Sequence, residues 1–309
     1  MITTVCMNPS FDKTASVKAL KPGELNRLCD VRVDVGGKGV NVAVVLKRLG
    51  VPVGCVGCLG ERGRESFLKM IRQEDVPFDY LPMPGEVRTN LKLVDESTRT
   101  VTEFNEPGIS MNQSQLEDFL NLLKKKSEKS DYVVLSGRLP EGCEETTYQR
   151  CLKVLEGKRC VLDCAGETLL HGIKEKPFLI KPNLPEIEAI MKKELRTLRG
   201  LRDAALFLIE YGAQNVIISM EKYGAMLVSR KDTFFAPALM VEARSTVGAG
   251  DAMIGGVLAG LSRGESLEDS FRCGVAAGAA SVMTDGTQLL RRPDFEAQIG
   301  RAHVRTPVT

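Results

Sequence analysis

Short apolar runs alternate with longer amphipathic segments along the second half of the chain. Each run has the length of a buried strand, and each longer segment carries apolar residues at helical spacing. Strands that alternate with helices are typical of a mainly parallel sheet with helices on both faces. We therefore expect an α/β fold with a doubly wound, mainly parallel sheet. The expected strands cover residues 132–136, 159–163, 178–181, 215–219 and 225–229, and the expected helices cover 112–128, 141–156, 185–193 and 201–211.

The same alternation is present near the start and the end of the chain. A proline-punctuated connection is expected at residues 77–84. Two helices rich in Ala and Gly, at 252–263 and 271–283, are expected to pack closely against each other. The remaining expected elements are strand 2–7, helix 40–50, strand 51–57 and helix 61–74.

Two pieces of the first half lack a helical period. Residues 13–35 contain short β-like runs, and residues 87–94 and 99–104 predict a hairpin around the turn at 95–98. Together they predict a small, mostly antiparallel sheet outside the main one. One face of such a sheet has to be covered, by a closed active site, by a partner subunit, or by both.

Polar residues stand at the ends of the expected strands. Doubly wound sheets bind their ligands at the carboxyl ends of the strands. These polar residues are therefore expected to gather around one cleft. They are Asn8, Ser136, Asp163, Lys181 and Ser219.

Residues 245–251 read Ser-Thr-Val-Gly-Ala-Gly-Asp and lead into the expected helix 252–263. Free N–H groups and the helix dipole make such a helix start attractive to an anion, and Gly248 and Gly250 let it approach the backbone. Asp251 beside a bound phosphate is suited to accept the proton of an attacking hydroxyl. The pattern alone also allows Asp251 to be only a helix cap.

A second glycine-rich helix start lies at residues 36–39, which read Gly-Gly-Lys-Gly. It is not a dinucleotide fingerprint, because Val42 stands where a glycine is required, and no Gly-Lys pair in the chain is followed by Ser or Thr as in a P-loop. Close helix–strand packing would explain the glycines equally well. Lys38, however, faces an unfavourable dipole unless an anion binds there.

Lys181, Asn183 and Glu186 fall within one turn after an expected strand. The amide and the carboxylate are suited to hold the water shell of a magnesium ion. A capping box, in which the two side chains satisfy the helix start, is the alternative. The sequence leaves both interpretations open.

The composition limits the classes of protein and the kinds of catalytic site that fit this chain. The 42 basic residues nearly balance the 40 acidic ones, which argues against a nucleic-acid or membrane-surface protein. The chain has two histidines, His171 and His303, which are far apart in sequence. It therefore has few histidines with which to form a catalytic triad or a zinc site. Carboxylates, lysines and backbone dipoles remain as chemical groups.

The nine scattered cysteines suit reduced, buried thiols, and Cys55 and Cys58 lie in an apolar strand-like run that favours packing over a metal site. No charged leader opens the chain, and no run approaches the roughly 18 apolar residues of a membrane span. We therefore expect a cytoplasmic protein that does not contact a membrane.

The combination of motifs resembles the phosphofructokinase B branch of the ribokinase-like sugar kinases, from Asn8 through Thr287. Two signatures carry the resemblance: residues 36–41, which read Gly-Gly-Lys-Gly-Val-Asn, and residues 246–251, which read Thr-Val-Gly-Ala-Gly-Asp. Supporting motifs lie at residues 88–90, 136–137 and 181–183. The subtype resembles 1-phosphofructokinase, with tagatose-6-phosphate kinase as the close relative.

The resemblance implies roles for individual residues. Asp251 would be the general base, and Gly248, Ala249 and Gly250 would form the anion hole for the migrating phosphoryl group. The sugar phosphate would contact Asp12, Arg27, Gly37, Lys38, Asn41, Arg88, Asn90, Ser136 and Arg138. ATP would contact Lys181, Asn183, Ser219, Gly224, Ser245 and Thr246, and Glu186 and Asn183 would hold magnesium through water.

The resemblance also implies a domain organisation. Residues 1–10, 36–85 and 107–298 would form the ribokinase-like core. Residues 11–35 and 86–106 would form a lid that closes on substrate and excludes water. Because relatives commonly pair through this lid, a homodimer is expected.

Three positions or segments depart from the family pattern. Glu221 stands where a glycine is usual near the nucleotide, and Arg138 replaces a small serine. Residues 299–309 fit no expected element and resemble translated adapter DNA, so a non-native tail is expected there.

Two classes of function follow. The first is an ATP- and Mg²⁺-dependent kinase that converts D-fructose 1-phosphate to fructose 1,6-bisphosphate, with tagatose 6-phosphate as the alternative substrate. The second is a non-catalytic sugar-phosphate sensor on the same scaffold. Asp251 favours the enzyme, since a sensor has no need of a base.

Overall fold

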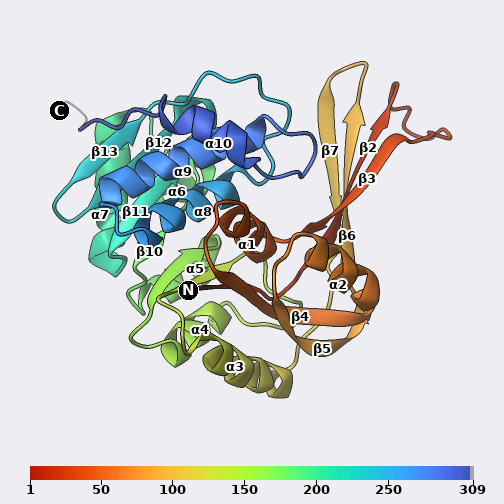
Figure 1. Ribbon diagram of the computed structural model, residues 1–309, viewed down its shortest axis with the longest axis horizontal. Coiled ribbons are helices and arrows are strands. Elements are labelled where there is room, and N and C mark those ends of the chain that lie inside the picture. The colour runs from red at the N-terminus through yellow and green to blue at the C-terminus, as the bar shows by residue number, and fades with distance from the viewer. Residues whose placement is uncertain (307–309) are drawn as a thin grey trace.

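The computed structural model describes residues 1–306 and contains a nine-stranded sheet between two layers of helices (Figure 1). All strand pairs from β11 to β5 are parallel, and β12 and β13 complete one edge as antiparallel strands. The expected doubly wound, mainly parallel sheet is confirmed. In spatial order the strands are β13 (Thr233–Ala236), β12 (Ala225–Ser229), β11 (Asn215–Ser219), β10 (Leu179–Ile180), β9 (Arg159–Asp163), β8 (Tyr132–Ser136), β1 (Ile2–Cys6), β4 (Val53–Arg62) and β5 (Phe78–Glu86).

Each face of the sheet has its own hydrophobic core. Strand residues alternate between the two cores because successive side chains of a strand point to opposite faces. One face packs against α1 (Lys38–Arg48), α2 (Arg64–Gln73), α8 (Ala249–Ser262), α9 (Leu267–Val282) and α10 (Arg292–Ile299). The other packs against α3 (Gln113–Ser127), α4 (Thr147–Val154), α5 (Gly166–Ile173), α6 (Leu184–Met191) and α7 (Leu198–Tyr211).

A second sheet of four strands projects from one side of this core (Figure 1). Its order is β3-β2-β6-β7, with β2 and β6 parallel and the outer pairs antiparallel. Two separated pieces of chain build it, as the sequence predicted. We call this sheet the lid; its strands are β2 (Ser10–Val17), β3 (Cys29–Gly36), β6 (Arg88–Asp95) and β7 (Thr100–Asn105).

The sequence misassigned or missed some elements at the margins of the core. The expected connection at 77–84 is wrong, because β5 occupies it as an edge strand, where Pro82 and Pro84 are tolerated. The short helix α5 and the edge strand β13 were not expected. The helix expected at 141–156 begins only at Thr147, after a loop.

The segment expected to be a non-native tail packs partly on the core. Ala302 is buried, and Arg305 exchanges two backbone hydrogen bonds with Phe235 of β13, of 2.8 and 3.0 Å. Residues 307–309 of that segment lie outside the described residues. The origin of the tail stays a prediction.

None of the helices in residues 1–306 combines the length and the apolar character that crossing a membrane requires.

Candidate active site

The carboxyl ends of the core strands and the inner face of the lid border one cavity of about 780 Å³. It contains both glycine-rich helix starts, so the two motifs far apart in sequence meet in one site. Arg27, Glu186 and Ser245 do not line it. The expected site residues that line it are Asp12, Gly37, Lys38, Asn41, Arg88, Asn90, Ser136, Arg138, Lys181, Asn183, Ser219, Gly224, Thr246, Gly248, Ala249, Gly250 and Asp251.

Helix α8 presents its first turn to this cavity. Gly248 precedes the helix with a φ of 76°, a left-handed conformation that glycine adopts without strain. No side chain caps the helix within the described chain, so the interpretation of Asp251 as a mere cap is wrong. The Ala249 N–H donates to the Thr246 carbonyl at 3.4 Å, whereas the N–H groups of Gly248 and Gly250 have no acceptor within residues 1–306. These free N–H groups and the helix dipole are suited to an anion.

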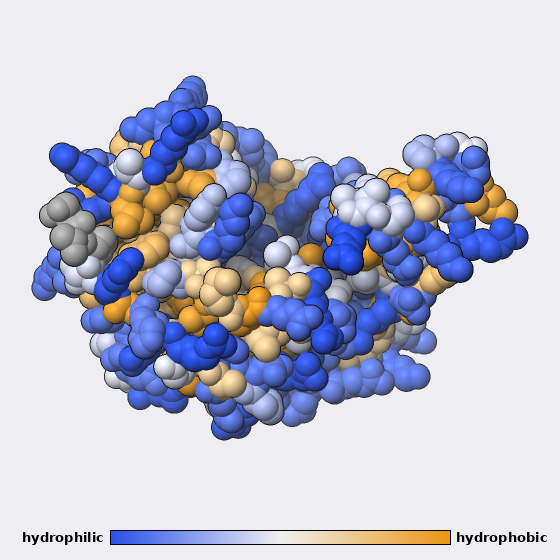
Figure 2. Space-filling view, turned by 90° about the horizontal axis from the view of Figure 1, so that it is seen from above, coloured by the Kyte–Doolittle hydropathy of each residue, from blue (hydrophilic) through white to orange (hydrophobic). Residues whose placement is uncertain are grey.

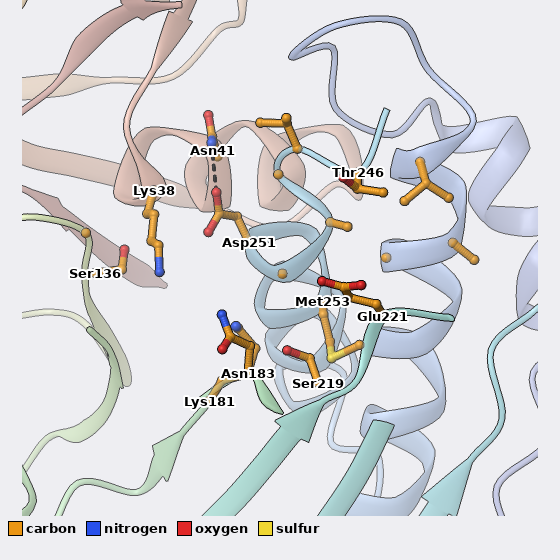
Figure 3. A pocket seen from close by; sticks show the side chains of 18 of the residues that line it. Lys38, Asn41, Ser136, Lys181, Asn183, Ser219, Glu221, Thr246, Asp251 and Met253 are labelled. Carbon is orange, nitrogen blue, oxygen red and sulfur yellow. Dashed lines mark hydrogen bonds between the residues drawn. The ribbon is translucent and has the colours of Figure 1, made fainter. Parts of the chain in front are cut away.

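Asp251 is buried and points toward the start of α1 (Figure 3). Asn41 Nδ2 donates a hydrogen bond of 2.8 Å to Asp251 Oδ2. Burial raises the pKa of the Asp251 carboxyl from 3.8 to about 6, although the charge of Lys38 and the Asn41 bond act to lower it. A carboxylate with a pKa near neutrality is well matched to proton abstraction.

Asp163 lies between Lys38 and Lys181, which line the cavity, but Asp163 itself does not line it, unlike the other polar residues expected at the strand ends. Its side chain is 1% exposed, with Lys38 Nζ 3.2 Å from Oδ2 and Lys181 Nζ 3.4 Å from Oδ1. Burial alone would raise the pKa of Asp163, but the charges of Lys181 and Lys38 outweigh it and lower the pKa. The same pairing raises the pKa of Lys38. The Lys38 ammonium is therefore held charged, and Lys181 pairs with the same carboxylate.

A hydrogen-bond cluster fixes Asp12 at the root of the lid. Ser10 Oγ and Asn90 Nδ2 donate to Asp12 Oδ1 at 2.8 and 3.0 Å. Lys92 Nζ lies 3.3 Å from Asp12 Oδ2, and both side chains are 7% exposed. The sequence analysis missed Lys92. Its position two residues after Asn90, on the same face of β6, was the available signal.

Arg88 is a buried cation at the other end of the lid strand β6. Its guanidinium donates to the carbonyls of Asn8 and Glu106 at 3.2 and 3.4 Å, and among residues 1–306 it forms no ion pair. Burial lowers the pKa of Arg88, and the nearby charge of Arg138 contributes in the same direction. Asp12 and Glu106 are near enough for their charges to act on Arg88, but neither forms an ion pair with it, so the guanidinium is suited to a bound anion such as phosphate.

Asn183 and Glu186 form the capping box that the sequence left open. Asn183 Oδ1 accepts from the Glu186 backbone N–H at 2.9 Å, and Glu186 Oε2 accepts from the Asn183 N–H at 2.8 Å. The box positions Asn183 at the cavity wall. The other carboxylate oxygen of Glu186 takes no part in the capping box.

An apolar slot extends the cavity away from the lid. It lies between the loop at 238–243 and helix α9, and its residues carry no polar group that sequence reasoning could single out. Ser219 and Gly224 stand at its edge, and Glu221 lines it as well. The slot has an apolar lining, which suits a nucleobase. Its lining residues are Ala238, Leu239, Met240, Val241, Ala243, Val275, Gly278, Ala279 and Val282.

Cys55 and Cys58 lie in β4 with buried side chains, and burial raises the pKa of both thiols. Their placement in the two hydrophobic cores confirms the packing interpretation.

The chain matches a protein family and known relatives over most of its length. The model of the family described as pfkB family carbohydrate kinase matches residues 6–293. The chain is 33% identical over 293 residues to the 1-phosphofructokinase of Vibrio cholerae, covering 93% of this chain and 91% of that protein. It is 35% identical over 301 residues to the ATP-dependent 6-phosphofructokinase isozyme 2 of Mycobacterium tuberculosis, covering 96% and 88%.

Solved structures agree with the fold. The phosphofructokinase-2 of Escherichia coli, in complex with substrates and products, superposes with a TM-score of 0.91 at 28% identity, covering 97% of this chain and 98% of that one. The ribokinase of Thermotoga maritima superposes with a TM-score of 0.82 at 26% identity, covering 97% and 99%.

Proposed function

Because the chain belongs to the pfkB family of carbohydrate kinases, we propose that it transfers phosphate from ATP to a ketohexose phosphate, most specifically from ATP to D-fructose 1-phosphate. The observation that supports this most directly is the placement of buried Asp251 at an anion-binding helix start. It shares its cavity with a buried, unpaired Arg88. One anion site serves the migrating phosphoryl group and the other serves the phosphate of the acceptor.

Asp251 removes the proton from the C6 hydroxyl of the acceptor as its oxygen attacks the γ-phosphorus. A new O–P bond forms, the bond to the departing ADP oxygen breaks, and the proton stays on Asp251. The N–H groups at 248–250 and the charged Lys181 stabilise the negative charge of the transition state. Asn41 orients Asp251 through the 2.8 Å hydrogen bond.

Magnesium accompanies ATP as the ion that neutralises its phosphates. Asn183 and Glu186 stay our candidates for holding its water shell, because the capping box uses only one oxygen of the Glu186 carboxylate.

The acceptor phosphate is assigned to Arg88, Arg138 and Lys38. The sugar hydroxyls are assigned to Asp12, Asn41 and Ser136. The Ser136 hydroxyl supports this, since it is buried at the cavity wall and has no hydrogen-bond partner within residues 1–306. Arg27 lies on an exposed stretch of the lid, outside the cavity, and its role stays a prediction.

Two other sugar phosphates are reasonable acceptors. The relative from M. tuberculosis is named a 6-phosphofructokinase, and a cup made of Arg88, Arg138 and Lys38 accepts phosphate from either end of a ketohexose. Fructose 6-phosphate and tagatose 6-phosphate therefore compete with fructose 1-phosphate in this proposal.

The test is ADP release by the purified protein with fructose 1-phosphate, fructose 6-phosphate, tagatose 6-phosphate and free fructose at equal concentrations. We expect the highest kcat/KM with fructose 1-phosphate. A preference for free fructose would refute the basic cup. Binding of a sugar phosphate without any turnover would support the non-catalytic sensor instead.

We also propose a homodimer that forms through the lid. Apolar side chains are exposed on its strands and on the loop between β2 and β3; Figure 2 shows hydrophobic residues among hydrophilic ones on this projecting part. Burial of such a patch by a second copy would remove it from water. The exposed residues are Leu25, Leu28, Val31, Val33, Val101 and Phe104.

A further inference from the structure

We propose that Glu221 binds the ribose hydroxyls of the phosphate donor and thereby selects ribonucleotides over deoxyribonucleotides. The proposal rests on the proposed function, because it requires a nucleotide in the cavity. It concerns a residue at which this chain departs from the glycine expected by family resemblance, so the carboxylate is a feature of this chain.

The backbone holds Glu221 in an unusual conformation. Its φ is 47°, in the left-handed region that side chains other than those of Asn and Asp rarely adopt. The turn η1 (Glu221–Tyr223) is closed by a 2.8 Å hydrogen bond from Met220 N–H to the Gly224 carbonyl. A non-glycine residue kept in such a conformation is more often found at functional sites than elsewhere.

The turn is also pinned to the wall of the apolar slot. At Gly224, an added Cβ would lie 2.0 Å from the Ala236 carbonyl oxygen and 2.8 Å from the Ala238 nitrogen. Only a glycine allows this approach. The contact brings Glu221 to the start of the loop that forms one side of the slot.

The carboxylate of Glu221 faces the cavity without a partner. Within residues 1–306 it takes part in no hydrogen bond or ion pair, and it lines the cavity. Figure 3 shows it on the side of Ser219 and Met253, with its oxygens toward the middle of the pocket, while Lys38 lies on the other side of Asp251.

The layout of the cavity determines which part of a nucleotide reaches Glu221. The apolar slot takes the base, and the first turn of α8 with Lys181 takes the terminal phosphate. The ribose then lies between them, beside the turn that carries Glu221. Phosphates repel a carboxylate and the base lies in an apolar environment, so the vicinal hydroxyls are the donors that Glu221 can accept from.

The experiment compares kcat/KM for ATP, 2′-deoxy-ATP and 3′-deoxy-ATP in the unaltered protein and in Glu221→Gly, Glu221→Gln and Tyr223→Ala. We expect the unaltered protein to prefer ATP about tenfold or more over both analogues. In Glu221→Gly the preference should fall to within about threefold, with Glu221→Gln intermediate. Tyr223 lies in the same turn but outside the cavity, so Tyr223→Ala should keep the preference.

Three results would overturn the inference. The first is equal use of ATP and its deoxy analogues by the unaltered protein. The second is a preference that Glu221→Gly leaves unchanged. The third is a Glu221→Gly variant in which the Mg²⁺ dependence of the rate changes but the preference for ATP over its deoxy analogues does not. That result would assign the carboxylate to metal binding.

The failure of the proposed function is a separate outcome. If no sugar phosphate is phosphorylated with any nucleotide, the kinase proposal fails. Calorimetric binding of ADP and 2′-deoxy-ADP to the same variants then still tests Glu221. Tighter binding of ADP that depends on Glu221 supports the inference, and equal binding contradicts it.

Discussion

Asn41 and Asp251 are 210 residues apart in sequence, yet Asn41 Nδ2 donates a 2.8 Å hydrogen bond to Asp251 Oδ2 (Figure 3). The bond joins the first turns of α1 and α8, which pack side by side in the core. It connects the glycine-rich start of α1 with the glycine-rich start of α8. The relation between the two motifs is therefore a direct contact.

Replacement of Asp251 with Asn should lower kcat by roughly 10²- to 10⁴-fold, because the variant has no base for the acceptor hydroxyl. The KM values for both substrates should change much less, since the shape of the cavity is kept. ADP release measures the rate, and thermal unfolding checks that the variant is folded. Turnover at the unaltered rate would reject Asp251 as the base.

The pH profile should report the raised pKa of Asp251. The base works when ionised, so kcat/KM should fall as the pH falls through about 6, where the pKa of this carboxyl lies. A sugar phosphate also titrates near this pH, so a comparison of variants is needed. The Asn41 hydrogen bond lowers the pKa of Asp251, and Asn41→Ala should therefore move the acid limb to higher pH. An acid limb of kcat/KM at the same pH in both proteins would contradict Asp251 as the titrating base.

Replacement of Lys92 with Met should destabilise the fold by about 3–5 kcal/mol, because it leaves the buried Asp12 carboxylate without its cation. The double variant Asp12→Asn/Lys92→Met should regain most of this stability, as both charges are gone. Its KM for the sugar phosphate should nevertheless stay raised, since a neutral amide replaces the charged carboxylate that accepts from the sugar hydroxyl. Urea unfolding and steady-state kinetics separate the two effects; a double variant with normal KM would exclude Asp12 from sugar binding.

Gly39 is required by close approach of α1 to β1. A Cβ at this position would lie 2.1 Å from the Val5 carbonyl oxygen, a backbone atom that cannot turn away. Gly39→Ala should cost about 3 kcal/mol or more of unfolding free energy. Gly54→Ala is the matched control, because its Cβ would meet only Met1 Cε at 3.7 Å. Equal stability of the two variants would contradict the close-packing argument.

Charged substitutions on the lid should separate the proposed dimer. Val33 and Phe104 are 43% and 53% exposed, and Val33→Asp/Phe104→Asp places two carboxylates in the apolar patch. We expect a monomer by light scattering after size exclusion. Phe207 is equally apolar and 43% exposed on α7, so Phe207→Asp should leave the oligomer intact. Identical masses for all three proteins would place the interface elsewhere.

Much of the core could be predicted from the sequence because its signals are local. Strands β8 and β9 match the expected residues, since apolar runs of this length bounded by polar residues report burial directly. The strand-end residues Asn8, Ser136, Lys181 and Ser219 line one cavity, because parallel strands end at the same edge.

The features that the sequence missed depend on contacts between distant segments. The partner of Lys92 is Asp12, which lies on a parallel neighbour strand, and nothing near Lys92 in sequence indicates it. The apolar slot is made of apolar residues from α9 and a loop that meet only in the folded chain. The strand β5 was hidden by prolines that only an edge position accepts.

The lid strands continue from core elements with almost no linker: β2 begins at Ser10 soon after β1, and β3 ends at Gly36, just before α1. Cavity residues also lie on the lid strands: Asp12 is on β2, and Arg88 is on β6. Under our proposals, acceptor preference and subunit pairing are therefore properties of the same module, the lid. A chimera that receives these two inserts from a relative should inherit both properties together.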